Sequence, residues 1–254
     1  LFNMGIVGSG YLFWASEKRV VKAVATTIIA ILLYGIYLTD SRGSMLATLT
    51  AAGYVVYRVR GATTVIVMLA LGLPILLAAT RLSTISSEEA SAEGRIDAWT
   101  EGLYMLRQNP LFGVGYNGFA DNNFGLTAHN SIILPLAEIG IPGYICWFGF
   151  CAICAVMCWR AAFAQEAAAD PNHQRAAHAI FVMGLSFFVG VMFLSQSYKP
   201  LLFIVCGLAA ARGVACFDTP QRLAAPGVLP TTGRTMKWAL LSIPSAWLVI
   251  KILT

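Results

Sequence analysis

Long apolar runs separated by short polar segments dominate this chain. The predicted spans are Val20–Thr39, Ser44–Tyr57, Thr63–Thr80, Ile141–Trp159, Ala179–Ser195, Leu201–Phe217 and Trp238–Thr254, after a partial run at Phe2–Ala15. Most approach the ~20 residues that a helix needs to cross a bilayer. Because backbone polar groups must pair internally in hydrocarbon, the runs should be helices. The pattern predicts an all-α, polytopic transmembrane helical bundle.

One hydrophilic stretch, residues 81–128, is long enough to hold structure of its own. Inside it, apolar side chains recur at spacings of three and four: Ile96, Trp99, Leu103 and Leu106. This spacing predicts an amphipathic helix, which Asn109-Pro110 should end. The helix can lie along the membrane surface, with Trp99 and Tyr104 near the headgroups, or pack on neighbouring helices. Both interpretations fit the spacing.

Composition agrees with the hydropathy pattern. The chain is 58% hydrophobic and 11% charged, whereas soluble domains carry ~25% charged residues. A water-soluble domain is therefore excluded. We expect one membrane domain, with transmembrane helices in 1–80, a loop region in 81–128, and a re-entrant segment followed by C-terminal transmembrane helices in 129–254. Because Leu1 lies within an apolar stretch, we expect the chain to be N-terminally truncated.

The positive charges predict how the chain is oriented. The net charge is +5, but the basic residues occupy short loops rather than one soluble face, so nucleic acid is not an expected partner. One set of alternate loops holds Lys18, Arg19, Lys22, Arg58, Arg60, Arg160, Arg175, Arg212, Arg222, Arg234 and Lys237; the other holds Arg42, Arg81, Arg95, Arg107 and Lys199. The richer side should be cytoplasmic, which places the 81–128 loop outside the cytoplasm.

Arg42 is the first candidate site residue. It lies in a tight outer turn, Thr39-Asp40-Ser41-Arg42-Gly43-Ser44. The next helix should begin at about Ser44, where free N–H groups and the positive helix end point outward. Together with a guanidinium they would suit a phosphate or diphosphate. The alternative is an arginine that snorkels to the interface beside Asp40.

Arg95 is the second candidate, in Glu93-Gly94-Arg95-Ile96-Asp97 at the start of the amphipathic helix. At the membrane surface, its guanidinium can hold an anion. It can equally pair with Glu93 or Asp97, an interaction of only ~0–1 kcal/mol at a surface.

His129 is the third candidate, and it is the only histidine that the predicted topology places on the outer side. It lies in Thr127-Ala128-His129-Asn130-Ser131, where the long loop re-enters an apolar segment that begins at Ile132. Imidazole titrates near neutral pH, so it can take a proton from a hydroxyl nucleophile. The alternative is a structural residue beside a helix cap at Asn130 or Ser131.

The cysteine pattern is predicted to be structural. Cys151, Cys154 and Cys158 lie on one stripe of a predicted span, where free cysteine acts as a small hydrophobe. His173 and His178 flank a cytoplasmic loop without a convincing third ligand. We therefore predict no metal site.

Three segments, in this order, resemble the O-antigen ligase and polymerase superfamily of bacterial membrane glycosyltransferases. They are Ser41-Arg42-Gly43, then Arg95-x-x-x-Trp99 with the segment 109–119 (NPLFGVGYNGF), then Ala128-His129-Asn130-Ser131 with the segment 138–143 (EIGIPG). The resemblance covers about residues 20–217. The chain departs from the family pattern because the N-terminal spans are missing and the stretch after Tyr198-Lys199-Pro200 is not diagnostic.

The resemblance implies a GT-C-like enzyme in the bacterial inner membrane, with its active site on the periplasmic side. Its donor would be a glycan on undecaprenyl diphosphate, and its leading acceptor the lipid A-core. The enzyme would require no nucleotide sugar, no ATP and no metal. Arg42 and Arg95 would bind the diphosphate, and His129 would act on the acceptor hydroxyl. Direct displacement would invert the anomeric centre.

Other functions stay open at this point. The acceptor can be another lipid-linked glycan, as in a polymerase, or a protein serine or threonine, as in a protein O-oligosaccharyltransferase. A transporter of lipid-linked sugar is an alternative from another class, but it would favour ionisable residues near the middle of spans. Here the charged candidates gather at one membrane face, which favours surface chemistry.

Overall fold

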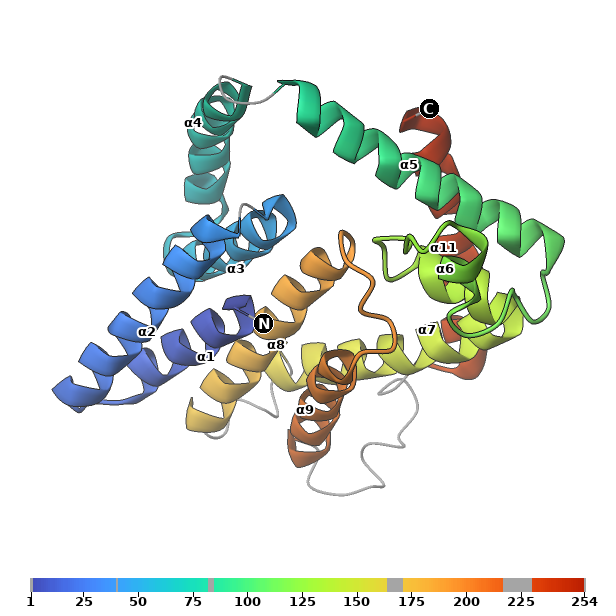
Figure 1. Cartoon of the computed structure of the whole chain (residues 1–254). Coiled ribbons are helices and arrows are strands. Elements are labelled where there is room, and N and C mark those ends of the chain that lie inside the picture. Colours follow the sequence, from blue (N-terminus) through green and yellow to red (C-terminus); the bar gives the residue numbers. More distant parts are fainter. Residues whose placement is uncertain (1, 40, 82–84, 164–170, 217–229, 254) are drawn as a thin grey trace.

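The computed structural model describes residues 2–39, 41–81, 85–163, 171–216 and 230–253. The helices are α1 Phe2–Ala15, α2 Arg19–Leu38, α3 Arg42–Arg60, α4 Ala62–Arg81, α5 Ile85–Gln108, α6 Gly118–Asn122, α7 Ile133–Phe163, α8 Pro171–Val191, α9 Pro200–Cys216 and α11 Thr232–Leu253. No strand occurs within these ranges (Figure 1). The predicted all-α class is confirmed. Phe217, Arg222 and Thr254 lie outside the described residues.

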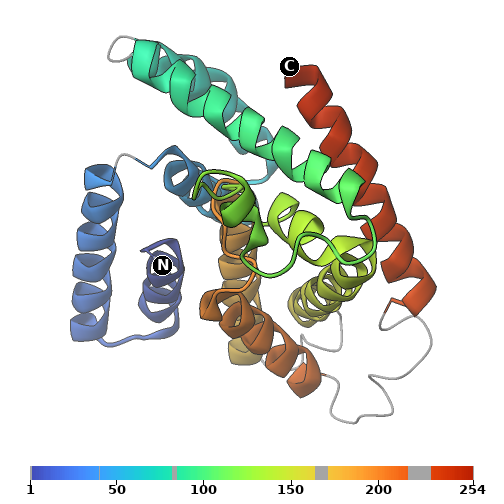
Figure 2. The ribbon, with the colours of Figure 1, turned by 45° about the vertical axis from the view of Figure 1, so that its right-hand side comes forward.

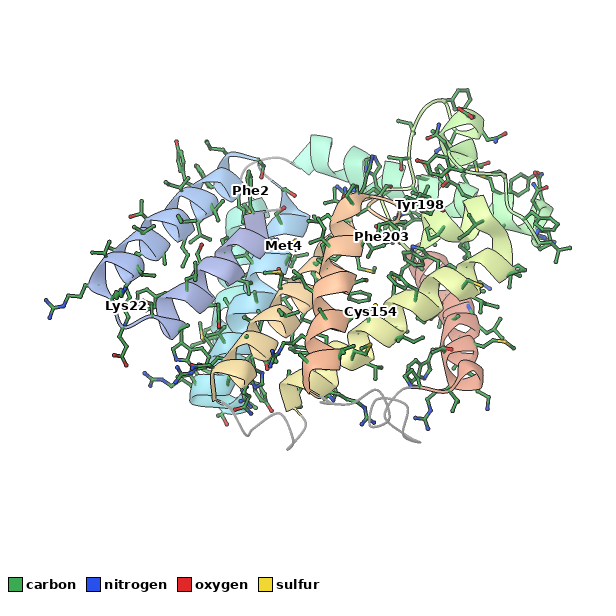
Figure 3. All side chains as sticks on the ribbon, turned by 90° about the horizontal axis from the view of Figure 1, so that it is seen from below. Phe2, Met4, Lys22, Cys154, Tyr198 and Phe203 are labelled. Carbon is green, nitrogen blue, oxygen red and sulfur yellow. The ribbon has the colours of Figure 1, made fainter. Side chains whose placement is uncertain are left out.

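The helices form one bundle around α7 and α8. α1 pairs with α2, and α3 packs on α8. α7 contacts α8, α9 and α11. The pair α1 and α2 lies on one side of α8, and α11 lies on the other (Figure 2). In Figure 3, α8, α9 and α11 run roughly alongside one another, and α5 lies across the end where Tyr198 is labelled. We call this the α5 end of the bundle.

The outer surface of the bundle is apolar. Within the described residues, three helices are long and apolar enough to cross a membrane: Arg19–Leu38, Ile133–Phe163 and Gln174–Val191. Large side chains such as Ile31, Leu33 and Leu71 are exposed on α2 and α4. Exposed apolar surface of this extent suits lipid rather than water. The chain is therefore a multi-pass membrane protein.

α8 ends earlier than the apolar pattern predicts. The predicted run extends to Ser195, but the helix ends at Val191. Residues 192–199 instead form turns between α8 and α9, and their backbone bonds to Asn130 and Ser131. The prediction for this end was wrong because a tertiary partner replaces the helical hydrogen bonds.

α7 begins earlier than the predicted span at Ile141. It starts at Ile133 and has a non-helical residue, Gly140, at φ 65° and ψ −175°. Pro142 lies two residues later and has no backbone N–H to donate. A short helix that begins at Ile133 is thus joined, across a kink, to the long span.

α5 is longer than predicted: it begins at Ile85, so Arg95 lies inside the helix and not at its start. It ends at Gln108, directly before Asn109-Pro110, as expected. One face of α5 packs on α7. Ala98, Gly102 and Met105 are buried against neighbouring helices, and Trp99 packs on the same cluster. Tyr104 is exposed. For Trp99, therefore, packing on neighbouring helices replaces the predicted contact with headgroups.

Candidate functional site

The 192–199 loop between α8 and α9 is the centre of the candidate site. Ser131 holds it from several directions. Its backbone N–H donates to Val191 O at 3.0 Å, and its hydroxyl donates to Leu194 O and accepts from Gln196 N at 2.8 Å. Ser197 Oγ donates to Ser131 O at 3.0 Å. Because Ser131 is buried, these bonds fix the loop against the start of α7.

His129 precedes this anchor in a strained backbone conformation. Its φ is 48°, in the left-handed region that non-glycine residues rarely occupy. Asn130 holds the next position because its Oδ1 caps α7, accepting from Ile132 N at 2.8 Å and Ile133 N at 3.1 Å. The His129 side chain is exposed. Helix capping therefore belongs to Asn130, and the imidazole is free to meet a ligand.

Arg95 reaches the 192–199 loop from α5. Its Cζ lies 6.0 Å from the centroid of the Phe193 ring, a cation–π geometry. One turn later along α5, Trp99 Nε1 donates to Ala128 O at 2.9 Å. The helix that carries Arg95 is thus attached directly to the residue before His129. The side chain of Glu93, its suggested partner, lies outside the described residues.

The Arg42 backbone reaches the same loop from α3. Arg42 is the first residue of α3, and Ser41 caps the helix by accepting from Ser44 N at 3.3 Å. Gly43 is buried, and a Cβ placed there would lie 3.0 Å from the Phe193 Cβ. The start of α3 therefore packs on Phe193. The Arg42 side chain and all of Asp40 lie outside the described residues.

Phe193 thus contacts two of the predicted site segments, the start of α3 and the part of α5 that carries Arg95. The 192–199 loop contacts the third, the turn that carries His129. Its ring contacts Arg95 and its Cβ faces Gly43, while its neighbours Met192 and Leu194 accept hydrogen bonds from Asn130 and Ser131. The sequence interpretation did not include Phe193 because it lies within an apparent apolar span. The polar residues Ser195, Gln196 and Ser197 are the signal that the span ends early.

A largely apolar cavity of about 360 Å³ lies between α7, α8 and α9. Ser131, Met192 and Gln196 line the part that borders the candidate site, and Cys158 and Ala209 line another part. Cys154, Cys158 and Cys206 pack with Leu202 and Ala209 at the contact between α7 and α9. These cysteines occupy packing positions, as predicted. The cavity has the chemistry to hold a hydrocarbon chain.

The α5 end therefore combines features suited to an anionic lipid. The start of α3 supplies backbone N–H groups and the positive end of a helix dipole. Arg95 supplies a permanent charge, and His129 supplies an exposed imidazole. In the part of the chain that the structure describes, no group of three or more metal-ligating side chains gathers.

Comparison with known proteins gives one result. Residues 27–148 match the family model described as O-Antigen ligase. The matched segment includes Arg42, Arg95 and His129. No curated protein and no solved structure matches the chain.

Proposed function

Because residues 27–148 belong to the O-antigen ligase family, we propose that this protein transfers a glycan from undecaprenyl diphosphate to an acceptor, with the lipid A-core as the leading one. The reaction takes place at the periplasmic face of the bacterial inner membrane. The observation that carries the proposal is the convergence of three segments on the 192–199 loop. The start of α3, Arg95 and the His129 turn all contact it.

The lipid chain and the diphosphate of the donor would bind to different parts of this site. Part of the polyprenyl chain enters the apolar cavity beside Ser131 and Gln196, where van der Waals packing replaces its contacts with lipid tails. The diphosphate remains at the α5 end, where Arg42, Arg95 and the N-terminus of α3 bind it. Charge-assisted hydrogen bonds from guanidinium to phosphate are among the stronger polar contacts in proteins.

The proposed reaction is a single displacement. His129 takes the proton from the acceptor hydroxyl, and the hydroxyl oxygen attacks the anomeric carbon. The bond between that carbon and the phosphate oxygen breaks, and its electron pair leaves with the undecaprenyl diphosphate. Attack opposite the leaving group inverts the anomeric centre. The positive groups stabilise the charge that develops on the diphosphate, and one such donor is typically worth 10²–10³ in rate.

The proposal is tested with purified protein in lipid vesicles and a lipid-linked glycan donor. Three acceptors are offered separately: lipid A-core, a second lipid-linked glycan, and a serine- and threonine-rich protein. Product on lipid A-core supports ligation. Product only on the second glycan identifies a polymerase, and product only on protein identifies a protein O-oligosaccharyltransferase. The absence of product with every acceptor contradicts the glycosyltransferase proposal.

A further inference from the structure

Large aromatic side chains stand exposed on the segment between α5 and α7. The exposed fractions are 83% for Phe112, 78% for Tyr116 and 99% for Phe124. Figure 3 shows the pale green α6 and its flanking turns extending past the end of α9 where Tyr198 is labelled. The segment that carries these side chains therefore lies at the α5 end of the bundle.

The backbone beneath Tyr116 is held rigidly against α7. Val114 N donates to Ala137 O at 2.9 Å, and Gly115 N donates to Glu138 O at 3.0 Å. At Gly113, with φ 66°, an added Cβ would lie 2.4 Å from Ala137 O. The two backbones are thus in direct contact, and this approach requires glycine.

A second attachment lies on the other side of Tyr116. Phe119 is fully buried in the cluster that includes Ala128 and Ile133. Its backbone N–H donates to the buried Glu138 carboxylate at 3.4 Å. Asn117, which lies between Gly115 and Phe119, adopts φ 63°. Asparagine tolerates this left-handed conformation in turns, whereas most other side chains would be strained in it. Gly115 and Phe119 are thus both fixed, and the Tyr116 ring between them is exposed.

Tyr116 lies beside the 192–199 loop through Tyr198. The two ring centroids are 5.4 Å apart at 60°. Tyr198 follows Ser197, whose hydroxyl donates to Ser131 O, so the ring pair borders the His129 turn. Burial, and then the charge of Glu138, raise the pKa of Tyr198 above its ordinary value. Tyr198 therefore keeps its proton and remains a neutral surface beside Tyr116.

Polar groups border this ring pair: the Glu138 carboxyl lies against Tyr198, and Asn117 directly follows Tyr116. Asn117 and Asn122 are exposed on the same short segment. A preorganised aromatic face with amides at its edge matches a pyranose ring, which has an apolar C–H face and hydroxyls at its rim.

We propose that Tyr116, Tyr198 and Asn117 form a sugar-binding subsite that holds the glycan of the lipid-linked donor next to the reacting centre. This inference rests on the proposed function for the identity of the glycan. The order in which the cavity and the ring pair lie along the 192–199 loop indicates that the subsite binds the glycan of the donor and not the acceptor. The 192–199 loop lines the cavity with Met192 and Gln196, and six residues after Met192 it presents Tyr198. Lipid, diphosphate and sugar would therefore lie in sequence along one loop.

The test measures binding without any transfer. The full chain in lipid nanodiscs is titrated with the free oligosaccharide released from the donor, and saturation-transfer NMR reports the bound sugar. Wild-type protein should bind it, and Tyr116→Ala should weaken binding about tenfold, the effect of losing one stacked ring. Tyr116→Phe should bind as wild type does. Tyr104→Ala, which removes an exposed tyrosine from α5, is the matched control and should have no effect.

Kinetics separate this inference from the proposed function. With a donor of several sugars, Tyr116→Ala should raise KM and leave kcat nearly unchanged. If glycan binding depends on Tyr116 but the protein transfers no glycan to any acceptor, the proposed function is refuted and the sugar-binding subsite is supported. Two results overturn the subsite: no binding of oligosaccharide by wild-type protein, or equal binding by wild-type protein and Tyr116→Ala.

Discussion

The indole Nε1 of Trp99 donates a hydrogen bond to the backbone carbonyl of Ala128 at 2.9 Å. Trp99 lies one helical turn after Arg95, and Ala128 directly precedes His129. Since Ala128 is fully buried, its carbonyl has no access to water as a substitute partner. This single bond therefore links the cation on α5 to the proton acceptor before α7.

Trp99→Phe should reduce transfer about tenfold. The substitution keeps an aromatic ring but leaves the buried Ala128 carbonyl unpaired, at a cost of ~1–3 kcal/mol. The Arg95 and His129 segments would then shift relative to each other. Initial rates with lipid-linked donor and lipid A-core measure the effect. Trp159→Phe, at an exposed position on α7, is the control. Wild-type rates for Trp99→Phe would show that the bond does not position the site.

His129→Ala should lower kcat by about 10²–10⁴, the usual contribution of a general base. Because the side chain is exposed, the variant should fold and enter the membrane normally. His178→Ala is the control: this histidine contacts Tyr54 and Arg58 instead and lies away from the 192–199 loop. Full activity of His129→Ala in reconstituted vesicles would refute its assignment as base.

Arg95→Ala should lower transfer by about 10²–10³, the typical effect of losing one charge-stabilising donor. Arg95→Lys should recover only part of the rate, because an ammonium cannot provide the planar guanidinium that faces Phe193. Arg107→Ala removes an exposed arginine from the last turn of the same helix. Equal loss in Arg95→Ala and Arg107→Ala would indicate a general surface-charge effect instead of diphosphate binding.

Arg42→Ala should impair catalysis to a similar degree without loss of membrane insertion. The backbone N–H groups at the start of α3 stay in place, so binding of undecaprenyl diphosphate should weaken but persist. Binding is measured with the purified variant and undecaprenyl diphosphate alone. Arg60→Ala, at the opposite end of α3, is the control. Unchanged affinity and rate in Arg42→Ala would remove this residue from the site.

Ser131→Ala should destabilise the protein by ~1–2 kcal/mol, since two partly buried backbone groups of the 192–199 loop, Leu194 O and Gln196 N, lose their hydrogen-bond partner. Thermal unfolding in detergent measures the shift in Tm. Ser245→Ala, at an exposed position on α11, should leave the Tm unchanged. An unshifted Tm for Ser131→Ala would mean that the loop does not depend on this anchor.

Local patterns predict the helices well where lipid surrounds them. The run Val20–Thr39 corresponds to α2 at Arg19–Leu38, because apolar length alone selects a spanning helix. The end of α8 was mispredicted because Met192 and Phe193 are apolar, yet their backbone and ring serve tertiary contacts. Similarly, Trp99 looks like a headgroup residue by spacing, and only the position of Ala128 shows why it faces inward.

The chemistry of the site was easier to predict than its geometry. Arg42, Arg95 and His129 stand out because charge is rare in this chain, and Arg42 and His129 also lie next to the start of a helix. Nothing in the local sequence indicates that Phe193 would lie between Arg95 and Gly43, since that contact joins residues about 100 and 150 positions apart in sequence. The left-handed backbone of His129 likewise depends on hydrogen bonds made by its neighbours.

The most direct test of the account is an experimental structure of the protein with undecaprenyl diphosphate bound. The account predicts a diphosphate at the α5 end, in hydrogen-bond contact with the guanidiniums of Arg42 and Arg95 and beside the 192–199 loop, with the His129 imidazole facing the same space. A diphosphate bound at the other end of the bundle, or an imidazole turned toward acyl chains, would contradict it.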